Sequence, residues 1–293
     1  MSHQAVMLHE AITALQIKTG WLYVDATLGA GGHSQTMLDL GAKVIAFDFD
    51  QRAIKRAREK FATAIKAGQM TVINENFNQL KDELKKLDIY QISGILFDFG
   101  TSSDQLTDQE RGLSFQGNAE LDMRLDERLG VKASDLLAVL GEKHLIRIFQ
   151  DYGGENQARA IAKKIVELRK KNIFIKNTEE LVDLILSIKR HEVRKSIHPA
   201  TKVFQALRIA VNMELSNIRE ALPQAYSVLR PHGRLVTIAF HEGEDHIVKD
   251  YFRQLASNNL GKEITHKPMT PSEEEIKDNP RSRSAKLRIF EKI

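Results

Sequence analysis

Residues 21–33, with the sequence Trp-Leu-Tyr-Val-Asp-Ala-Thr-Leu-Gly-Ala-Gly-Gly-His, decide the fold class of this chain. A short apolar run ends at Asp25, a glycine-rich turn follows, and Ser34–Leu40 is predicted to form a helix. This order of strand, tight turn and helix N-terminus is typical of the start of a doubly wound α/β domain. Glycines let the backbone pass close to a ligand, and the first N–H groups of a helix are free to bind one.

The spacing of the glycines separates three interpretations of this turn. A dinucleotide-binding G-x-G-x-x-G motif does not fit, because the glycines stand at Gly29, Gly31 and Gly32. A P-loop does not fit either, because no Lys-Ser or Lys-Thr pair follows. An acid at the strand end followed by a short G-x-G turn resembles the first motif of S-adenosylmethionine (SAM) methyltransferases. The glycines alone favour an ordinary strand-to-helix turn.

Acidic residues end three of the predicted strands, at Asp25, Asp48 and Asp98. In a parallel sheet these strand ends share one edge, and ligands bind there. We expect Asp48 to hold a ribose diol, because Asp50 suits the cap of a helix over 51–67. Phe77 follows the predicted strand 70–73, where an adenine could stack, although a core aromatic fits this position equally well.

The alternation of strands and helices stops after Ser103 and resumes at His198. Between them, helices are predicted over 133–140, 143–150, 157–171 and 179–189, with Thr178 as a cap. We therefore expect a domain in two parts, 1–105 and 198–293, interrupted by a helical insertion over 106–197. In the second part, strands are predicted over 234–240 and 285–290, the last at the sheet edge.

The composition narrows the possible chemistry. The chain has 293 residues, 28% of them charged and 42% hydrophobic, which indicates a globular protein. It has no cysteine, which excludes disulfides, thiolate zinc sites and the cysteine nucleophile of cytosine C5 methylation. We find no metal-binding motif, no signal peptide and no membrane span, and expect a cytoplasmic protein. The net charge of +4 permits a nucleic-acid partner.

Longer motifs run from end to end of the chain. They are Asp25-Ala-Thr-x-Gly-x-Gly-Gly-His33-Ser34, Phe77, Asp98-Phe-Gly-Thr-Ser-Ser103-x-Gln105-Leu, Arg111-Gly-Leu-Ser-Phe115, Leu121-Asp-Met-Arg124-Leu-Asp126, Tyr152-Gly, His198-Pro-Ala-Thr-x-x-Phe-Gln-Ala-Leu-Arg208-Ile-Ala-Val-Asn212 and Asn279-Pro-Arg-Ser-Arg283-Ser-Ala-Lys-Leu-Arg288. In these stretches the chain resembles the bacterial 16S rRNA (cytosine-N4)-methyltransferase family. It departs from the family's Phe-His-Ser-Leu-Glu-Asp-Arg segment, with Phe-His-Glu-Gly-Glu-Asp-His at 240–246.

The resemblance implies a Rossmann-like SAM-dependent methyltransferase domain with an inserted all-helical subdomain. It implies SAM as methyl donor and, as acceptor, a cytidine in the decoding region of 16S rRNA in the small ribosomal subunit, where the modification supports decoding fidelity. The cofactor-binding roles that it carries over fall on Gly31, Gly32, His33, Asp48, Phe77, Asp98 and Gln105. The sequence does not distinguish a monomer from a homodimer.

An exocyclic cytosine amine is a poor nucleophile, because its lone pair is delocalised into the ring. We expect Asp98, Ser102 and Ser103 to orient this amine and to stabilise the charge that develops on it. The Asp/Asn-Pro-Pro-aromatic loop that DNA amino methyltransferases use for this purpose is absent here. His241 is a second candidate, and a buried structural histidine at the strand end is equally plausible.

Basic residues form three clusters that we expect to contact RNA phosphates, although such runs are usually solvated helix faces. The clusters are Arg159, Lys163, Lys164, Arg169, Lys170, Lys171 and Lys176; Lys189, Arg190, Arg194 and Lys195; and Arg281, Arg283, Lys286 and Arg288. Two alternatives remain open. One is a SAM-dependent methyltransferase for DNA or a small molecule, and the other is a SAM-binding module without catalysis.

Overall fold

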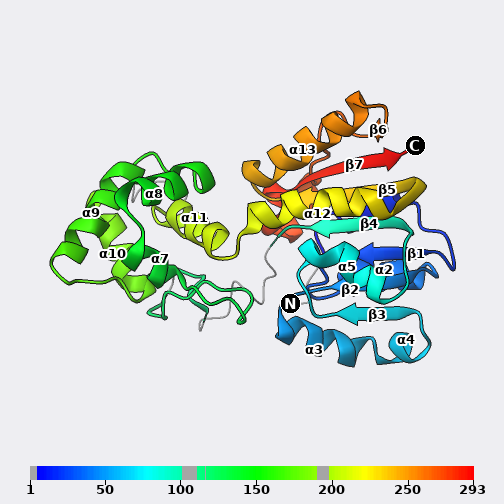
Figure 1. The fold of residues 1–293 in the computed structure, drawn as a ribbon, viewed down its shortest axis with the longest axis horizontal. Helices are drawn as coiled ribbons and strands as arrows, with labels where there is room; N and C mark the ends of the chain where they lie inside the picture. The colour runs from blue at the N-terminus through cyan, green and yellow to red at the C-terminus, as the bar shows by residue number, and fades with distance from the viewer. Residues whose placement is uncertain (1–4, 101–110, 116, 190–197) are drawn as a thin grey trace. The chain divides into compact units, whose positions relative to one another are not determined.

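The computed structural model describes residues 5–100, 111–115, 117–189 and 198–293. The chain forms two compact units (Figure 1): the sheet unit, Met1–Gly100 with Leu215–Ile293, and the helical unit, Thr101–Glu214. The second boundary therefore lies after residue 214, whereas the sequence pattern placed it before residue 198. The reason is helix α11 (Thr201–Val211), which packs against the π-helical turn η3 (Ile148–Tyr152) of the helical unit.

The sheet unit is built on a seven-stranded sheet of order β3-β2-β1-β4-β5-β7-β6. The strands are β1 (Leu22–Asp25), β2 (Lys43–Phe47), β3 (Met70–Ile73), β4 (Ile92–Asp98), β5 (Leu229–Ala239), β6 (Gly261–Glu263) and β7 (Lys286–Lys292). The first five strands in this order are parallel, and β7 runs antiparallel to both of its neighbours. Successive strands move in opposite directions from β1 and β4, so the topological switch point lies between these two strands. The predicted doubly wound α/β class is confirmed.

Strand β7 does not lie at the sheet edge, so that expectation from the sequence is wrong. The edge strand is β6, which pairs with β7 from Gly261 to Glu263. Its three residues, Gly-Lys-Glu, carry no apolar alternation that could have predicted a strand. A Cβ atom at Gly261 would lie 2.4 Å from the Phe290 ring, so glycine is what lets the edge strand pair with β7.

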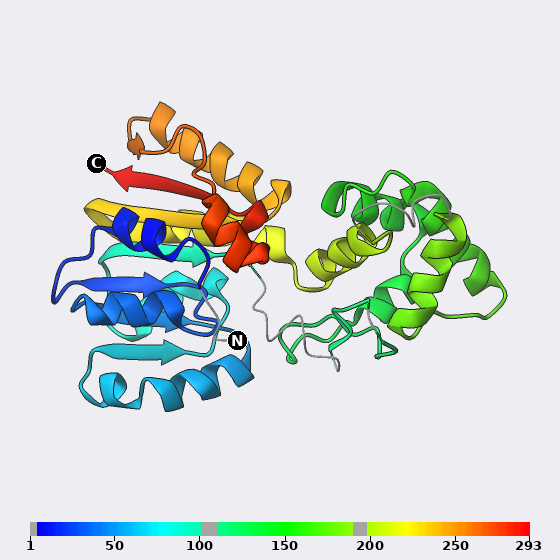
Figure 2. The same cartoon turned by 180° about the vertical axis from the view of Figure 1, so that it is seen from behind.

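Helices cover both faces of the sheet, and Figures 1 and 2 show these faces in turn. The described helical elements of the sheet unit are α1 (Leu8–Leu15), α2 (Gly32–Asp39), α3 (Gln51–Lys60), α4 (Ala62–Lys66), η1 (Phe77–Gln79), α5 (Leu80–Lys86), α12 (Glu214–Val228, whose first residue belongs to the helical unit), α13 (Glu242–Ser257), α14 (Glu273–Asp278) and η5 (Pro280–Ser284). On one face, α1, α2 and α3 pack over a core that includes Leu287 and Ile289 of β7. On the other face, Phe290 contacts Phe252 of α13, with 5.3 Å between ring centroids. Successive side chains of β7 point to opposite faces of the sheet, and helices bury both of these faces.

The helical unit has its own buried core. Within its described residues, the helices besides α11 are α7 (Ala133–Val139), α8 (Glu142–Arg147), α9 (Ala158–Lys170) and α10 (Thr178–Ile188). These match the four helices predicted for the insertion, and Phe149, Ile161 and Ile185 are fully buried in the unit. The cap of α10 is Asn177, whose side chain accepts from the Glu180 N–H at 2.9 Å, and Thr178 is the first helical residue instead of the cap.

Candidate active site

The three acids predicted to share one edge of the sheet do so. Asp25 ends β1, Asp98 ends β4 next to it, and Asp48 directly follows β2. Thr27 joins the two strands at the switch point, because its hydroxyl oxygen accepts from the Asp98 N–H at 2.6 Å and its own N–H donates to Asp25 Oδ1 at 3.2 Å. The acids are thus brought together by the parallel pairing of β2, β1 and β4.

Asp25 organises the glycine turn from inside the protein. Its carboxylate is buried, and Oδ2 accepts from the Ser34 hydroxyl at 2.6 Å. Burial raises the pKa of Asp25, while the nearby His33 and the hydrogen bonds from Ser34 and Thr27 act in the opposite direction. Because both oxygens already accept hydrogen bonds within the protein, Asp25 fixes the start of α2.

Two glycines of the turn, Gly31 and Gly32, have no room for a side chain. Gly31 precedes α2 with a φ of 72°, and a Cβ atom there would lie 2.6 Å from the Phe61 ring. A Cβ atom at Gly32 would lie 2.8 Å from the Ala5 Cβ. The first N–H groups of α2, those of Gly32 and His33, have no acceptor within the helix. The turn therefore offers backbone donors to a ligand at the switch point.

The side chain of His33 holds the N-terminal segment in place. The imidazole is buried, and its Nε2 donates to the carbonyl oxygen of Val6 at 3.2 Å. Burial lowers the pKa of His33, against the opposing influence of Asp25. A contact between this residue and a cofactor would therefore use the backbone N–H, since the ring is already engaged.

Asp48 lies beside the glycine turn with its charge inside the protein. Its Oδ2 accepts from the Gly29 N–H at 2.9 Å, and its Oδ1 accepts from the Asp50 N–H at 2.8 Å. Burial raises the pKa of Asp48 to about 7, and the negative charges of Asp50 and Asp25 add to this effect. An ionised carboxylate can accept about four hydrogen bonds, so Asp48 retains capacity for a diol. Asp50 caps α3, as predicted, through its bond to the Arg52 N–H.

Asp98 and an aromatic cluster complete the described part of the edge. Asp98 is half-buried, and burial raises its pKa to about 7, with a further contribution from the charges of Asp25 and Glu244. Phe77 is buried and meets Phe97 and Phe99 edge-on, with ring centroids 5.6 and 6.0 Å apart. Three other predicted site residues lie outside the described residues, namely Ser102, Ser103 and Gln105.

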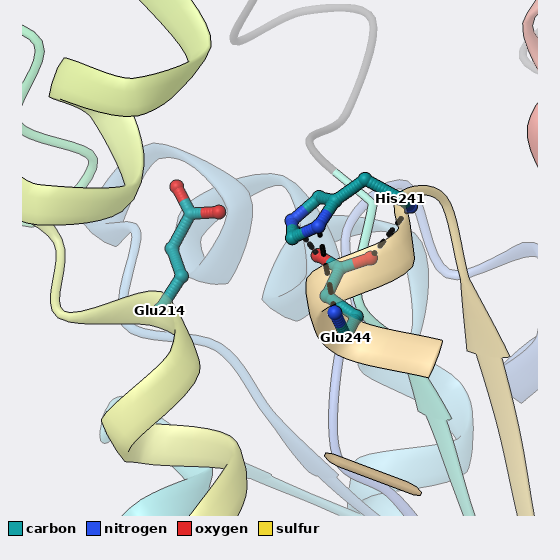
Figure 3. Close-up of side chains that lie close together, drawn as sticks. All are labelled: Glu214, His241 and Glu244. Atoms are coloured by element: carbon teal, nitrogen blue, oxygen red, sulfur yellow. Dashed lines mark hydrogen bonds and ion pairs between the residues drawn. The ribbon is translucent and has the colours of Figure 1, made fainter. Parts of the chain in front are cut away.

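His241 caps a helix, and Figure 3 shows the arrangement. It precedes α13, where its Nδ1 accepts from the Glu244 N–H at 3.4 Å, and its Nε2 lies 3.1 Å from Glu244 Oε1. The other oxygen of Glu244 accepts from the Phe240 N–H at 2.7 Å. Sequence reasoning missed Glu244, although the spacing His-x-x-Glu resembles a capping box and could have revealed it. Glu214, also drawn, belongs to the helical unit, where it accepts from Arg208 Nε at 2.8 Å.

Comparison with known proteins identifies the family of the chain. The family model described as "MraW methylase family" matches residues 1–293. The chain belongs to the MraW methylase family. Two curated relatives are named "Ribosomal RNA small subunit methyltransferase H". The one from Clostridioides difficile is 42% identical over 99% of both chains, and the one from Oenococcus oeni is 41% identical over 99% of this chain and 98% of the relative.

The departure from the family's sequence after β5 leaves the start of α13 intact. The changed residues Glu242 and His246 are exposed, and Gly243 is half-buried. The unchanged residues Glu244 and Asp245 are both buried. In this MraW methylase family chain, the end of β5 is held by the buried Glu244, which accepts from the Phe240 N–H at 2.7 Å.

Three basic residues expected to contact RNA are engaged within the protein, so their assignment to an RNA surface is wrong. Lys189 forms a buried ion pair of 2.8 Å with Glu155, and Arg288 forms one of 2.6 Å with Asp245. Arg169 donates to two main-chain carbonyl oxygens at the end of α7. Lys189 and Arg288 are buried and Arg169 is half-buried, because of tertiary contacts that a run of basic residues in the sequence does not reveal.

Exposed basic residues remain on both units. They are Arg159, Lys163, Lys164, Lys170, Lys171 and Lys176 in the helical unit, and Arg281 and Arg283 in the sheet unit. Lys286 is half-buried, 3.5 Å from Asp245. Arg190, Arg194 and Lys195 lie outside the described residues. None of the helices in the described part of the chain is long and apolar enough to span a bilayer.

The residues at the sheet edge fit SAM, the methyl donor that a methylase of this kind needs. The sulfonium and ammonium groups of SAM are cationic, and the acids at the edge supply the opposite charge. The carboxylate of Asp48 suits the ribose hydroxyls. The first N–H groups of α2, at Gly32 and His33, suit the methionine carboxylate. The cationic groups, the ribose and the carboxylate of SAM thus have groups of matching chemistry at this edge of the sheet unit.

Proposed function

We propose that the chain transfers a methyl group from SAM to the exocyclic N4 of a cytidine in the decoding region of 16S rRNA, within the small ribosomal subunit. The observation that carries this proposal is the convergence of Asp25, Asp48 and Asp98 at the switch point, beside a glycine turn that leads into the free N–H groups at the start of α2. The names of the curated relatives support rRNA as the acceptor. Such a reaction takes place in the cytoplasm and modifies the site at which codons are decoded.

The glycine turn and Asp48 bind the polar parts of SAM in this proposal. Backbone N–H groups of Gly32 and His33 hold the methionine carboxylate, and Gly31, whose own N–H donates to the Leu28 carbonyl oxygen at 2.7 Å, shapes the turn that presents them. Asp48 accepts hydrogen bonds from the two ribose hydroxyls, while its existing bonds to Gly29 and Asp50 fix its orientation.

The aromatic cluster and the segment after β4 bind the remaining parts. Phe77 provides an apolar surface for the adenine, held from behind by Phe97 and Phe99. Asp98 and Gln105 complete the cofactor-binding set, as the family resemblance implies. The exposed lysines and arginines of the helical unit contact RNA phosphates.

Asp98 positions the acceptor amine and takes its proton. SAM supplies an electrophilic methyl group on a sulfonium. N4 would form its bond to the methyl carbon as the carbon–sulfur bond breaks and the neutral thioether leaves. Positive charge would then develop on the nitrogen, where a carboxylate within hydrogen-bond reach stabilises it. A pKa of about 7 suits Asp98 to accept the N4 proton near neutral pH. Ser102 and Ser103 offer further hydrogen-bond acceptors to the same amine.

Complementation of a strain that lacks this protein tests the proposal. Nucleoside mass spectrometry of 16S rRNA should show N4-methylated cytidine with the wild-type protein and none with Asp98→Ala. The proposal is contradicted if the cytidine stays unmethylated in both strains although the wild-type protein is folded and present at normal levels. That result would favour a different acceptor or a SAM-binding module without catalysis.

A further inference from the structure

Phe240 lies beside the candidate catalytic acid, one strand away in the sheet. It directly follows β5, whose Ile238 is the register partner of Asp98 at the end of β4. The backbone continues this pairing beyond β4, because the Phe99 N–H donates to the Ile238 carbonyl oxygen at 3.0 Å. Phe240 therefore extends from the same edge of the sheet as Asp98.

Two contacts fix the position of Phe240. Its ring packs against Gly100 so closely that a Cβ atom at Gly100 would lie 2.6 Å from the Phe240 Cε2. Its backbone N–H donates to the buried carboxylate of Glu244 at 2.7 Å. The ring thus rests on the turn two residues after Asp98, with its backbone held by the cap of α13.

The ring of Phe240 is half-buried, with one part packed against the core of the sheet unit. Phe77, Phe97 and Phe99 form a cluster of their own on the same edge. Among the described residues, Phe240 makes no ring–ring contact, which distinguishes it from that cluster. It is therefore an aromatic surface beside Asp98 that the packing of the sheet unit leaves partly open.

We propose that Phe240 stacks on the acceptor cytosine and orients it for methyl transfer, an inference that rests on the proposed function. An enzyme that modifies a base must take it out of the RNA stack, and the base then loses its stacking partners. An aromatic side chain replaces that stacking and fixes the plane of the base. Phe240 would hold the cytosine so that its amine meets Asp98, and Phe240 is accordingly a positioning residue.

The test compares three replacements at one position. Phe240→Leu keeps an apolar side chain against Gly100 but removes the aromatic face, whereas Phe240→Tyr and Phe240→Trp keep that face. We expect Phe240→Leu to lower kcat/KM for unmethylated small subunits by about 10- to 100-fold. The Tyr and Trp variants should stay within about threefold of the wild type, and SAM binding by calorimetry should be unchanged in all three.

Gly100→Ala provides an independent variant that moves the ring without removing it. The added methyl group would displace the Phe240 ring, so kcat/KM for the RNA should fall in the wild-type background. In the Phe240→Leu background the same change should have little further effect, because the displaced ring is already absent. Circular dichroism and SAM binding show whether each variant in this double-mutant cycle is folded.

The outcomes separate this inference from the proposed function. If the wild type methylates RNA but Phe240→Leu retains full kcat/KM, or Phe240→Tyr loses as much as Phe240→Leu, stacking by Phe240 is refuted and the function stands. If the wild type methylates no RNA, the proposed function fails and the inference falls with it. A loss confined to Phe240→Leu and Gly100→Ala, with SAM binding intact, supports the inference.

Discussion

Replacing Asp48 with asparagine removes a buried charge beside the glycine turn while preserving the size of the side chain. In the wild type, both carboxylate oxygens accept backbone hydrogen bonds, from Gly29 at 2.9 Å and Asp50 at 2.8 Å. Asparagine offers one acceptor oxygen, so one of these bonds is lost, and the ribose hydroxyls lose their charged acceptor. A hydrogen bond to a charged group contributes about 1.5–3 kcal/mol, so SAM should bind about 10- to 150-fold more weakly.

The pH dependence of SAM binding provides a second, sharper test of Asp48. With a pKa of about 7, the ionised fraction of Asp48 rises from about one-tenth at pH 6 to about nine-tenths at pH 8. If the ionised form binds the ribose, the affinity of the wild type for SAM should rise at least about tenfold over this range. In Asp48→Asn the rise should be smaller, because only Asp98 then titrates there.

The raised pKa of Asp48 also determines at which pH this residue stabilises the protein in the absence of SAM. The folded state raises the pKa from 3.8 to about 7, so the folded protein binds more protons than the unfolded chain between these values. The contribution of Asp48 to stability is present below about pH 4 and is lost as the pH rises through about 7. A pKa change of this size corresponds to at most about 4 kcal/mol. Bound SAM should offset that loss.

Isothermal titration calorimetry at pH 6, 7 and 8 measures these effects. Asp50→Asn is the matched control, since it makes the same chemical change two residues away and asparagine remains a good helix cap. At pH 8, where Asp48 is mostly ionised with or without the charge of Asp50, the SAM affinity of this control should stay close to that of the wild type. If Asp48→Asn is folded and binds SAM within about twofold of the wild type across this range, Asp48 does not hold the ribose.

Three further predictions follow from the site and the two units. Asp98→Ala at saturating SAM should lower kcat for methyl transfer by at least about 100-fold, measured with labelled SAM, and full activity would exclude Asp98 as the positioning group. Glu155→Gln should leave Lys189 charged and buried without its counter-ion, so the free energy of unfolding measured in urea should fall by about 3–5 kcal/mol. A fall below about 0.5 kcal/mol would mean that the ion pair is dispensable. The double variant Lys163→Gln/Lys164→Gln should reduce the slope of log K for RNA against log salt by about 1.5–2, and an unchanged slope would mean that α9 does not meet phosphates.

The gathering of three acids at the carboxyl ends of the parallel strands was predictable, because it follows from local signals and one topological rule. Each of Asp25, Asp48 and Asp98 ends a short apolar run, and parallel strands bring such ends together. The cap at Asp50 was predictable for the same kind of reason, since capping depends on neighbouring residues. The edge strand at Gly261 was not predictable, because its pairing depends on Phe290 and β7, and not on any pattern of its own.

The roles of individual polar side chains depended on contacts between distant residues. The sequence leaves His241 as a catalytic candidate besides Asp98, Ser102 and Ser103, and the structure shows that His241 forms a helix cap with Glu244. In the sequence, Arg288 and Lys189 cannot be distinguished from the exposed basic residues near them. Only the fold showed that acids 43 and 34 residues away pair with them inside the protein.

The most direct measurement of the central claim is transfer of a labelled methyl group from SAM to purified small ribosomal subunits that lack the modification. The labelled nucleoside is then identified by mass spectrometry, with Asp98→Ala as the inactive control. The account predicts a single labelled product, N4-methylated cytidine, that is absent with the variant. Label on another nucleoside, or no label from a protein that binds SAM, would contradict it.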